Sequence, residues 1–375
     1  MARGGSGPGD VLSLRALNRA TLERQLLVRR VKLSAFDAIE HLVGLQAQSP
    51  LAPYVGLWTR LEGFQPDELV QLMTEREVVR IALMRNTVHL VTAQDCLMLR
   101  PLTQVIFDRA LRQRLSAPPL RGLDVDALTA AGRALVEERP RTNTELGALL
   151  REQWPDRDAA LLVFAIRSQV PLVQVPPRGI WGKGGQVTCT SAEAWLGSPL
   201  DADPSPDDMV MRYLAAFGPA TVKDVQQWCG LTRLRDVAER LRPRLATFRD
   251  EAGNELFDLP DAPRPDPDTP APVRFLPEYD NLFVSHADRT RVISETDLNS
   301  LRATERLVRG SVLVDGFFRG LWQIRRQRGV ATLHIESYGP LSNHDRDAVA
   351  EEGVHLLTFA ASNAKAREIE FTVRE

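Results

Sequence analysis

Two glutamines stand one residue apart in the chain, at Gln46 and Gln48, and a proline follows them at Pro50. A primary amide offers a carbonyl acceptor and an NH₂ donor, but it cannot take up a proton as a carboxylate does. A pair of amides can therefore hold a water molecule in place, or direct a dipole at a developing positive charge. The chemistry open to these residues is positioning and electrostatic stabilisation rather than acid–base catalysis.

The geometry of the glutamine pair depends on the backbone. Residues i and i+2 point apart on a helix, whereas they point to the same side in an extended chain. Because Pro50 disfavours helical geometry at Ser49, we expect the pair to lie where a helix ends and its two amides converge. Gln46-Ala47-Gln48 alone is also typical of solvated surface, so a functional interpretation depends on the flanking segments.

Metal and thiol chemistry find little support in the sequence. Cys96, Cys189 and Cys229 are far apart and odd in number, which favours reduced structural thiols over a disulfide framework or a zinc site. The six histidines show no spacing typical of metal ligands. We expect no metal and no cofactor.

The composition is that of a globular protein with several domains. The chain has 375 residues, of which 43% are hydrophobic and 26% charged. No apolar run approaches the roughly 20 residues of a membrane helix. Residues 1–9 are glycine-rich and lack the apolar core of a signal peptide, so we expect a flexible tail and a cytoplasmic protein.

Three joints divide the chain, at 116–119, 198–208 and 259–272, and the last of them carries six prolines. We therefore expect a tail over residues 1–10, three helix-plus-ribbon units over 11–120, 121–200 and 201–262, a proline-rich linker over 263–272, and a β-rich domain over 273–375.

Hydrophobic periodicity predicts the elements of the three units. The hairpins turn at Arg85-Asn86, at 179–185 and at 252–254, and Asn143 and Thr221 stand where caps would begin second helices. The first unit has helices at 12–30, 35–45, 67–74 and 93–115 and a hairpin at 80–91; the second has helices at 125–138, 143–153 and 157–168 and a ribbon at 172–189; the third has helices at 207–217, 221–229 and 234–241 and a hairpin at 245–259.

The pattern changes after the linker. Strands are predicted at 310–318, 321–327, 330–337 and 367–373, with a helix at 343–361. Two or three helices followed by a ribbon is the layout of a winged helix, a variant of the helix-turn-helix. The sequence predicts an α+β fold, predominantly α, with tandem winged-helix units.

Six further segments are informative through their number and order along the chain. They are Gly44-Leu45-Gln46-Ala47-Gln48-Ser49-Pro50, Met84-Arg85-Asn86-Thr87-Val88-His89-Leu90, Gly218-Pro219-Ala220-Thr221, Leu276-Pro277-Glu278-Tyr279-Asp280-Asn281, Asp288-Arg289-Thr290-Arg291 and Val314-Asp315-Gly316-Phe317. Together they resemble the family of winged-helix DNA glycosylases that contains AlkZ and YcaQ (also called AlkX), and the resemblance spans roughly residues 12 to 370.

The resemblance implies winged helices arranged in a C-shape around double-stranded DNA, with a β-barrel-like C-terminal domain. It also implies hydrolysis of the N-glycosidic bond of N7-alkylated purines, including the unhooking of interstrand crosslinks. Gln46 and Gln48 match the catalytic Gln-apolar-Gln motif of the AlkZ-like branch, whereas YcaQ-like members carry an aspartate at the second position. That branch is associated with resistance to DNA-alkylating antibiotics.

Two amides are sufficient for this reaction in principle. An N7-alkylated purine already carries a positive charge and leaves as a neutral molecule without being protonated. The remaining tasks are to place a water molecule and to stabilise the oxocarbenium-like sugar. We expect Gln48 to orient the water and Gln46 to support it or the sugar cation, although these roles could be reversed.

Arginine-rich segments are the candidates for contact with DNA. Arg325, Arg326 and Arg328 form a predicted hairpin tip, which is equally typical of a solvated turn. Salt-dependent contacts with phosphates are expected from a further group of residues. They are Arg233 and Arg235 beside the last helix of the third unit, Arg178 and Lys183 beside the second ribbon, and His286 and Arg289.

The flanking residues of the family-like segments have a structural interpretation as well. Arg85 and His89 are expected to support the fold of the first unit. Asp280 and Asn281 are expected to stabilise the third unit against the C-terminal domain. The tryptophans are expected in the core, since no aromatic cluster in the sequence marks a pocket for an extruded base.

Two other functions use the same features. A non-catalytic winged-helix regulator would bind DNA and leave Gln46 and Gln48 idle, and a dimer on palindromic sites would favour it. A repair lyase would form a Schiff base through an amine, but no lysine lies near Gln46 in the sequence. We expect a monomeric, nucleoid-associated glycosylase.

Overall fold

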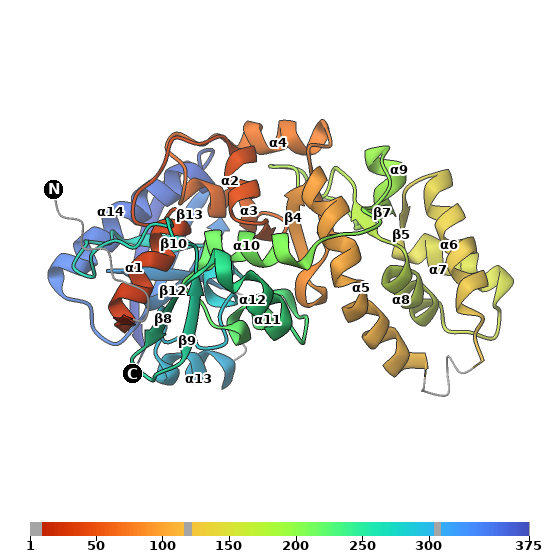
Figure 1. Ribbon diagram of the computed structural model, residues 1–375. Helices are drawn as coiled ribbons and strands as arrows, with labels where there is room; N and C mark the ends of the chain where they lie inside the picture. The colour runs from red at the N-terminus through yellow and green to blue at the C-terminus, as the bar shows by residue number, and fades with distance from the viewer. Residues whose placement is uncertain (1–9, 116–121, 304–308, 375) are drawn as a thin grey trace.

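The computed structural model describes residues 10–115, 122–303 and 309–374. The α+β class is confirmed, with 45% of the protein helical. The body is elongated, and residues 125–169 lie at the opposite end from residues 274–374 (Figure 1). The tail expected over 1–10, apart from Asp10, and the joint expected at 116–119 lie outside the described residues.

One six-stranded sheet runs through the first two predicted units. Its third strand in spatial order pairs antiparallel with neighbours from both units, so the units are joined by backbone hydrogen bonds. The hairpin predicted at 80–91 is confirmed, while the ribbon predicted at 172–189 is paired only near its ends. The spatial order is β2 (Leu45–Gln46), β4 (Val88–Thr92), β3 (Val78–Ala82), β6 (Leu172–Gln174), β7 (Thr188–Ser191) and β5 (Arg141–Thr142).

The helices of this part largely follow the predictions. Those at 93–115, 125–138 and 143–153 are confirmed to the residue, although Thr142, not Asn143, caps the last of them through a capping box with Glu145. The helices are α1 (Leu14–Arg24), α2 (Ala35–His41), α3 (Ala52–Trp58), α4 (Pro66–Thr74), the 3₁₀ turn η1 (Met84–Asn86), α5 (Ala93–Leu115), α6 (Val125–Glu138), α7 (Asn143–Gln153), α8 (Ala159–Gln169) and α9 (Ala192–Leu196).

The third predicted unit is confirmed as three helices and a hairpin. Thr221 caps its second helix as expected, in a capping box with Asp224. A short strand from the beginning of the chain adds to the hairpin in parallel. The elements are α10 (Pro206–Phe217), α11 (Val222–Cys229), α12 (Arg235–Leu241), η3 (Arg242–Arg244), β8 (Ala246–Asp250), β9 (Glu255–Asp258) and β1 (Val11–Leu12).

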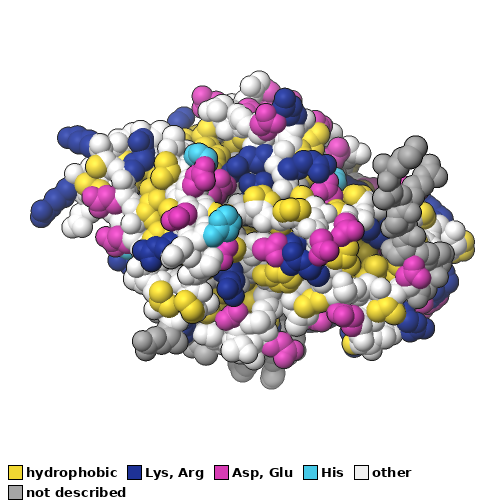
Figure 2. All heavy atoms as spheres, turned by 90° about the vertical axis from the view of Figure 1, so that its left-hand side faces the viewer, with side chains coloured by type: hydrophobic (Ala, Val, Ile, Leu, Met, Phe, Trp, Pro, Cys, Tyr) yellow, Lys and Arg dark blue, Asp and Glu magenta, His cyan; other side chains and the backbone are white. Residues whose placement is uncertain are grey.

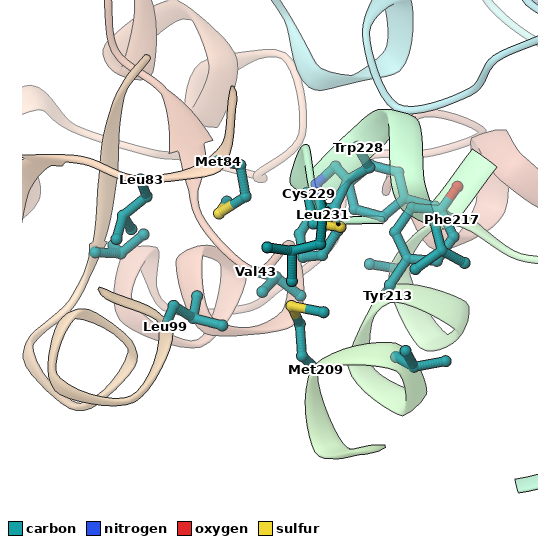
Figure 3. Packing of buried hydrophobic residues seen from close by; sticks show 14 of the residues in the cluster. Val43, Leu83, Met84, Leu99, Met209, Tyr213, Phe217, Trp228, Cys229 and Leu231 are labelled. Carbon is teal, nitrogen blue, oxygen red and sulfur yellow. Dashed lines mark hydrogen bonds between the residues drawn. The ribbon is translucent and has the colours of Figure 1, made fainter. Parts of the chain in front are cut away.

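The first and third units share a hydrophobic core. Leu83 and Leu99 of the first unit belong to the same buried cluster as Met209, Tyr213 and Trp228 of the third (Figure 3). Side chains packed in this way exclude water from both units at once. The region around η1 is therefore held from two sides.

The C-terminal part is an open five-stranded sheet with α14 (Asn343–Ala360) packed on it. Within the described residues its outer strands do not pair with each other, so the expected barrel-like closure is not confirmed. The single strand predicted at 310–318 is wrong, because Gly316 turns the chain there with a φ of 79°. The strands are β10 (Arg274–Leu276), β11 (Gly310–Val314), β12 (Phe317–Gln327), β13 (Val330–Tyr338) and β14 (Ala366–Arg374). Between β10 and β11 the chain forms η4 (Asn281–Phe283) and α13 (Glu295–Ala303).

The proline-rich linker lies against α1 rather than hanging free. Arg15 Nε donates to the Pro267 carbonyl at 2.8 Å, and Arg19 Nε donates to the Thr269 carbonyl at 2.6 Å. Arg24 reaches the carbonyl of Pro263 at 3.2 Å. Three arginines on one helix thus fix the path of the chain between the third unit and the C-terminal sheet.

Candidate functional site

The glutamine pair lies where β2 ends at the edge of the six-stranded sheet. Gln46 is paired with His89 of β4, and Ala47 N donates to the Val88 carbonyl at 2.8 Å. The chain enters β2 through Gly44 with a φ of 88°, where a Cβ would lie 2.9 Å from the Leu90 carbonyl oxygen. The pair was expected at the end of a helix; α2 instead ends at His41, and Gln46 lies in the strand β2 that follows.

The Gln46 side chain is almost buried, with 7% of its surface exposed. Its Oε1 accepts a hydrogen bond from Arg85 Nη2 at 2.8 Å. Because a guanidinium has only donors, the amide must present its oxygen to Arg85 and its NH₂ elsewhere. Within the described residues, the Gln46 NH₂ donates to no protein group.

Gln48 is exposed and follows in a bend of the chain. Its Oε1 accepts from the backbone N–H of Val88 at 3.2 Å, which fixes the orientation of this amide too. A carbonyl oxygen has two lone pairs, so the Gln48 oxygen keeps one for a further donor. Both glutamines are thus hydrogen-bonded to the hairpin of β3 and β4.

Arg85 was expected only to support the fold, but it is a central residue of the site. It lies in η1 with a φ of 56°, and its Nη1 donates to the Trp228 carbonyl at the end of α11. Burial lowers the pKa of Arg85 to about 10, and the nearby Arg289 acts in the same direction. Its signal in the sequence was the left-handed turn Arg85-Asn86 directly after β3.

Arg80 supports the motif from the opposite side. It is 2% exposed, and its Nη2 donates to the Ala47 carbonyl, between the two glutamines, at 2.8 Å. Burial lowers its pKa to about 10. The expectation for His89 as fold support agrees with its place in the core, where burial lowers its pKa to about 3 and keeps the ring neutral.

Asp280 and Asn281 hold the first unit, and the expectation that they stabilise the third was wrong. Asn281 donates to the Gly44 carbonyl at 2.7 Å and accepts from Gln46 N at 3.3 Å. Asp280 binds Arg60 with both carboxylate oxygens, at 2.8 and 2.9 Å. The segment that follows β10 therefore fixes the backbone of the glutamine motif.

The tip at Arg325, Arg326 and Arg328 is confirmed as the hairpin of β12 and β13. Arg326 turns back onto the end of α14, where it donates to the carbonyl of Ala360 and to Asn363. Cationic and acidic side chains are interspersed on the end face that Figure 2 shows. That face presents no continuous basic stripe.

A cleft of about 900 Å³ lies between the third unit and α13, and its lining mixes both charges. Lys223, Arg235, Arg289 and Arg302 share it with acidic side chains, namely Asp224, Asp250, Glu251, Glu255, Asp288 and Glu295. Burial and the charge of Arg302 lower the pKa of Arg289. Its Nε has no partner in the part of the chain that the structure describes. An acceptor such as a phosphate oxygen would satisfy it.

The remaining predicted DNA contacts are scattered. Arg233 is exposed just before α12 and does not line the cleft, while Arg178 and Lys183 lie in the loop between β6 and β7. His286 is a correction: it is 1% exposed and bonds the Phe217 carbonyl, so it cannot reach a nucleic acid.

An aromatic cluster was missed as well. Trp58, Trp181 and Phe359 meet with Tyr54 and Phe64, with centroid distances of 4.9 to 6.1 Å. Because the members come from distant segments, among them α3, the loop after β6 and α14, no local pattern in the sequence indicates the cluster.

The described residues contain neither a candidate metal site nor a helix fit to cross a membrane. They contain no cluster of three or more histidine, cysteine or acidic side chains fit for a metal ion. None of the described helices has the length and apolar character to cross a bilayer. Cys96, Cys189 and Cys229 are buried and unpaired, as expected.

Comparisons with known proteins agree on one family. The family model described as DNA glycosylase AlkZ-like matches residues 39–359. An interstrand DNA cross-link repair glycosylase of Streptomyces sahachiroi is 22% identical over 364 residues, which cover 89% of this chain and 93% of the relative. The solved structure of the S. sahachiroi DNA glycosylase AlkZ has a TM-score of 0.70 and 19% identity, and the match covers 96% of this chain and all of that one.

Proposed function

The chain belongs to the AlkZ-like family of DNA glycosylases, and from this we propose that it hydrolyses the N-glycosidic bond of cationic, N7-alkylated purines in duplex DNA. The substrates include purines joined in interstrand crosslinks, as the name of the S. sahachiroi relative suggests. Protection against a DNA-alkylating antibiotic is the corresponding biological role. The observation that carries the proposal is the pair of oriented amides at Gln46 and Gln48.

The reaction can proceed with amides because the leaving base needs no proton. The C1′–N9 bond breaks, and its electron pair cancels the positive charge of the purine, which leaves neutral. Water then adds to the oxocarbenium carbon of the sugar and releases its proton to solvent. No step requires a proton on the leaving base, and in the described structure no carboxylate is hydrogen-bonded to either glutamine.

The orientation of the amides favours one division of roles. Gln48 is exposed, and its carbonyl keeps a lone pair that can hold the attacking water in line. The Gln46 carbonyl is occupied by Arg85, so Gln46 acts toward the substrate as a donor. We assign the water to Gln48 on this basis.

The DNA is proposed to be held by phosphate contacts from arginines on several elements. Arg289 and Arg235 are the strongest candidates because they share one cleft. Arg233, Arg178, Lys183 and the hairpin tip at 325–328 are secondary candidates. We propose that the helix-plus-ribbon units within 11–120, 121–200 and 201–262 act as winged helices of a monomeric cytoplasmic enzyme.

The test is release of free base from a duplex that contains one N7-methylguanine. We expect N7-methylguanine, and no unmodified guanine, in the supernatant. Gln48→Ala and Gln46→Ala should each lower the single-turnover rate constant by about 10²-fold or more, the effect of losing one positioned polar group. Gln71→Ala, an exposed glutamine on α4, is the matched control and should keep the full rate.

The outcome also separates the alternatives. Tight binding without release of base from any alkylated duplex would support a DNA-binding regulator. Strand cleavage with borohydride trapping of the protein on DNA would support a lyase. An N7–N7 crosslinked duplex, converted to single strands of unequal mobility, tests the unhooking activity.

A further inference from the structure

Arg85 joins two parts of the molecule through neutral acceptors. One branch of its guanidinium donates to Gln46 Oε1 at 2.8 Å, and the other donates to the Trp228 carbonyl. In the described residues Arg85 has no carboxylate partner. Arg85 is half-buried, and an arginine that gives up part of its hydration usually faces a carboxylate, so the two carbonyls indicate a role other than charge pairing.

The contact with Arg85 decides whether the oxygen or the NH₂ of the Gln46 amide is available to a substrate. The terminal torsion of a glutamine is broad and roughly two-fold, so its oxygen and nitrogen exchange places at little cost. A guanidinium can only donate, and it therefore selects the orientation in which the oxygen points inward. Without Arg85, the free amide would populate both orientations.

The backbone around Arg85 is built to keep this contact. Arg85 and Asn86 both have positive φ, 56° and 58°, which defines the tight turn between β3 and β4. Gly230 lies against it, with an imagined Cβ 3.1 Å from Arg85 N. A larger residue at Gly230 would have to displace the turn, so the backbone of Arg85 is packed closely from this side.

We infer that Arg85 is a positioning residue that fixes Gln46 as a hydrogen-bond donor toward the departing purine. The inference rests on the proposed glycosylase activity. As the C1′–N9 bond breaks, electron density rises on the acceptor atoms of the base, N3 and O6. The NH₂ of Gln46 has no acceptor among the described residues, so we assign it to stabilise that density, and hydrogen-bonding of its carbonyl to a cation strengthens the donor.

The test is a double-mutant cycle on the N7-methylguanine duplex, measured as the single-turnover rate constant and the DNA dissociation constant. Arg85→Ala should lower the rate constant by about 10- to 100-fold, the range for a lost hydrogen bond to a charged group. DNA affinity should change by less than about threefold. Arg85→Lys should recover part of the rate, since an ammonium can still donate to the Gln46 oxygen.

Two further variants separate positioning from plain structural support. In a Gln46→Ala background, Arg85→Ala should cost little more, because Arg85 acts through Gln46. Gln46→Glu keeps an acceptor for Arg85 but loses the donor, so it should be as slow as Gln46→Ala. Circular dichroism melts show whether each variant is folded.

Three results would overturn the inference. They are additive losses in the double variant, a Gln46→Glu enzyme that works at the wild-type rate, and an Arg85→Ala enzyme that loses affinity but keeps its rate at saturation. A wild-type protein that releases no alkylated base refutes the proposed function itself, and the inference with it. The wild-type and variant arms therefore keep the two failures apart.

Discussion

Asp280→Asn tests how firmly the glutamine motif is anchored. The substitution keeps the size of the side chain but removes the charge that faces Arg60. Both side chains are buried, at 0% and 1% exposure, and the two hydrogen bonds are 2.8 and 2.9 Å long. The Arg60 guanidinium would then be left inside the protein without a counter-charge.

The expected loss of stability is large. Removing one partner of a buried ion pair costs about 3–5 kcal/mol. An unfolding entropy of about 2.1 cal/mol/K per residue gives roughly 0.8 kcal/mol/K for 375 residues. The midpoint of thermal unfolding should therefore fall by about 4–6 °C.

The assay is differential scanning calorimetry at neutral pH on wild type, Asp280→Asn and Glu62→Gln. Glu62 makes the same type of contact at the surface, with Lys32 at 3.8 Å. Its loss should cost no more than about 1 kcal/mol. Equal melting temperatures for Asp280→Asn and Glu62→Gln would refute the reasoning. The double substitution of Arg60→Met with Asp280→Leu replaces both charges by apolar groups and should regain part of the lost stability.

Three further predictions concern pH, packing and salt. Burial lowers the pKa of His89 to about 3, whereas in the unfolded chain this pKa is near 6.5. The contribution of the neutral His89 ring to the free energy of unfolding is thus complete above pH 6.5 and is lost as the pH falls toward 3. The free energy of unfolding, measured with urea between pH 6.5 and 5, should change less steeply with pH in His89→Gln than in wild type, by up to about 1.4 kcal/mol per pH unit. Equal pH slopes for the two proteins would contradict this. Gly310→Ala places a methyl 2.2 Å from the Trp322 ring, so chemical denaturation should show a loss of about 1–3 kcal/mol, against none for Gly184→Ala, which has open space. If Arg289 contacts one phosphate, Arg289→Ala should reduce the slope of log K against log salt by about 0.9 in a DNA-binding titration; Arg133→Ala, paired with Glu137, should leave the slope unchanged.

Local signals in the sequence were sufficient for most elements. Hydrophobic periodicity located α5, α6 and α7 to the residue, and the turn at Arg85-Asn86 located the hairpin of β3 and β4. Short elements such as β2 and α3 were missed, because two to seven residues carry too little periodicity. The strand predicted over 310–318 was wrong, since Asp315-Gly316 is a turn between two apolar runs.

The site was predictable only in part, because its contacts join distant segments. Gln46 and Gln48 came from the family-like motif, but their orientation depends on Arg85, 39 residues away from Gln46. The anchor at Asn281 lies 235 residues from Gln46. A single sequence contains no signal for pairings of this range, and it contained no warning that His286 would be buried.

The ion pairs of α1 can form only late in the synthesis of the chain. Arg24 pairs with Asp258, and Arg15 with Asp315, so the helix finds its partners 234 and 300 residues further along the chain. At about 5–20 residues per second, a ribosome needs roughly 15–60 seconds to cover that distance. Until then Leu17 and Leu22 of α1 lack most of the apolar side chains that they pack against in the folded protein. The contacts that join α1 to the third unit and to the C-terminal sheet can therefore be complete only after residue 315 has been made.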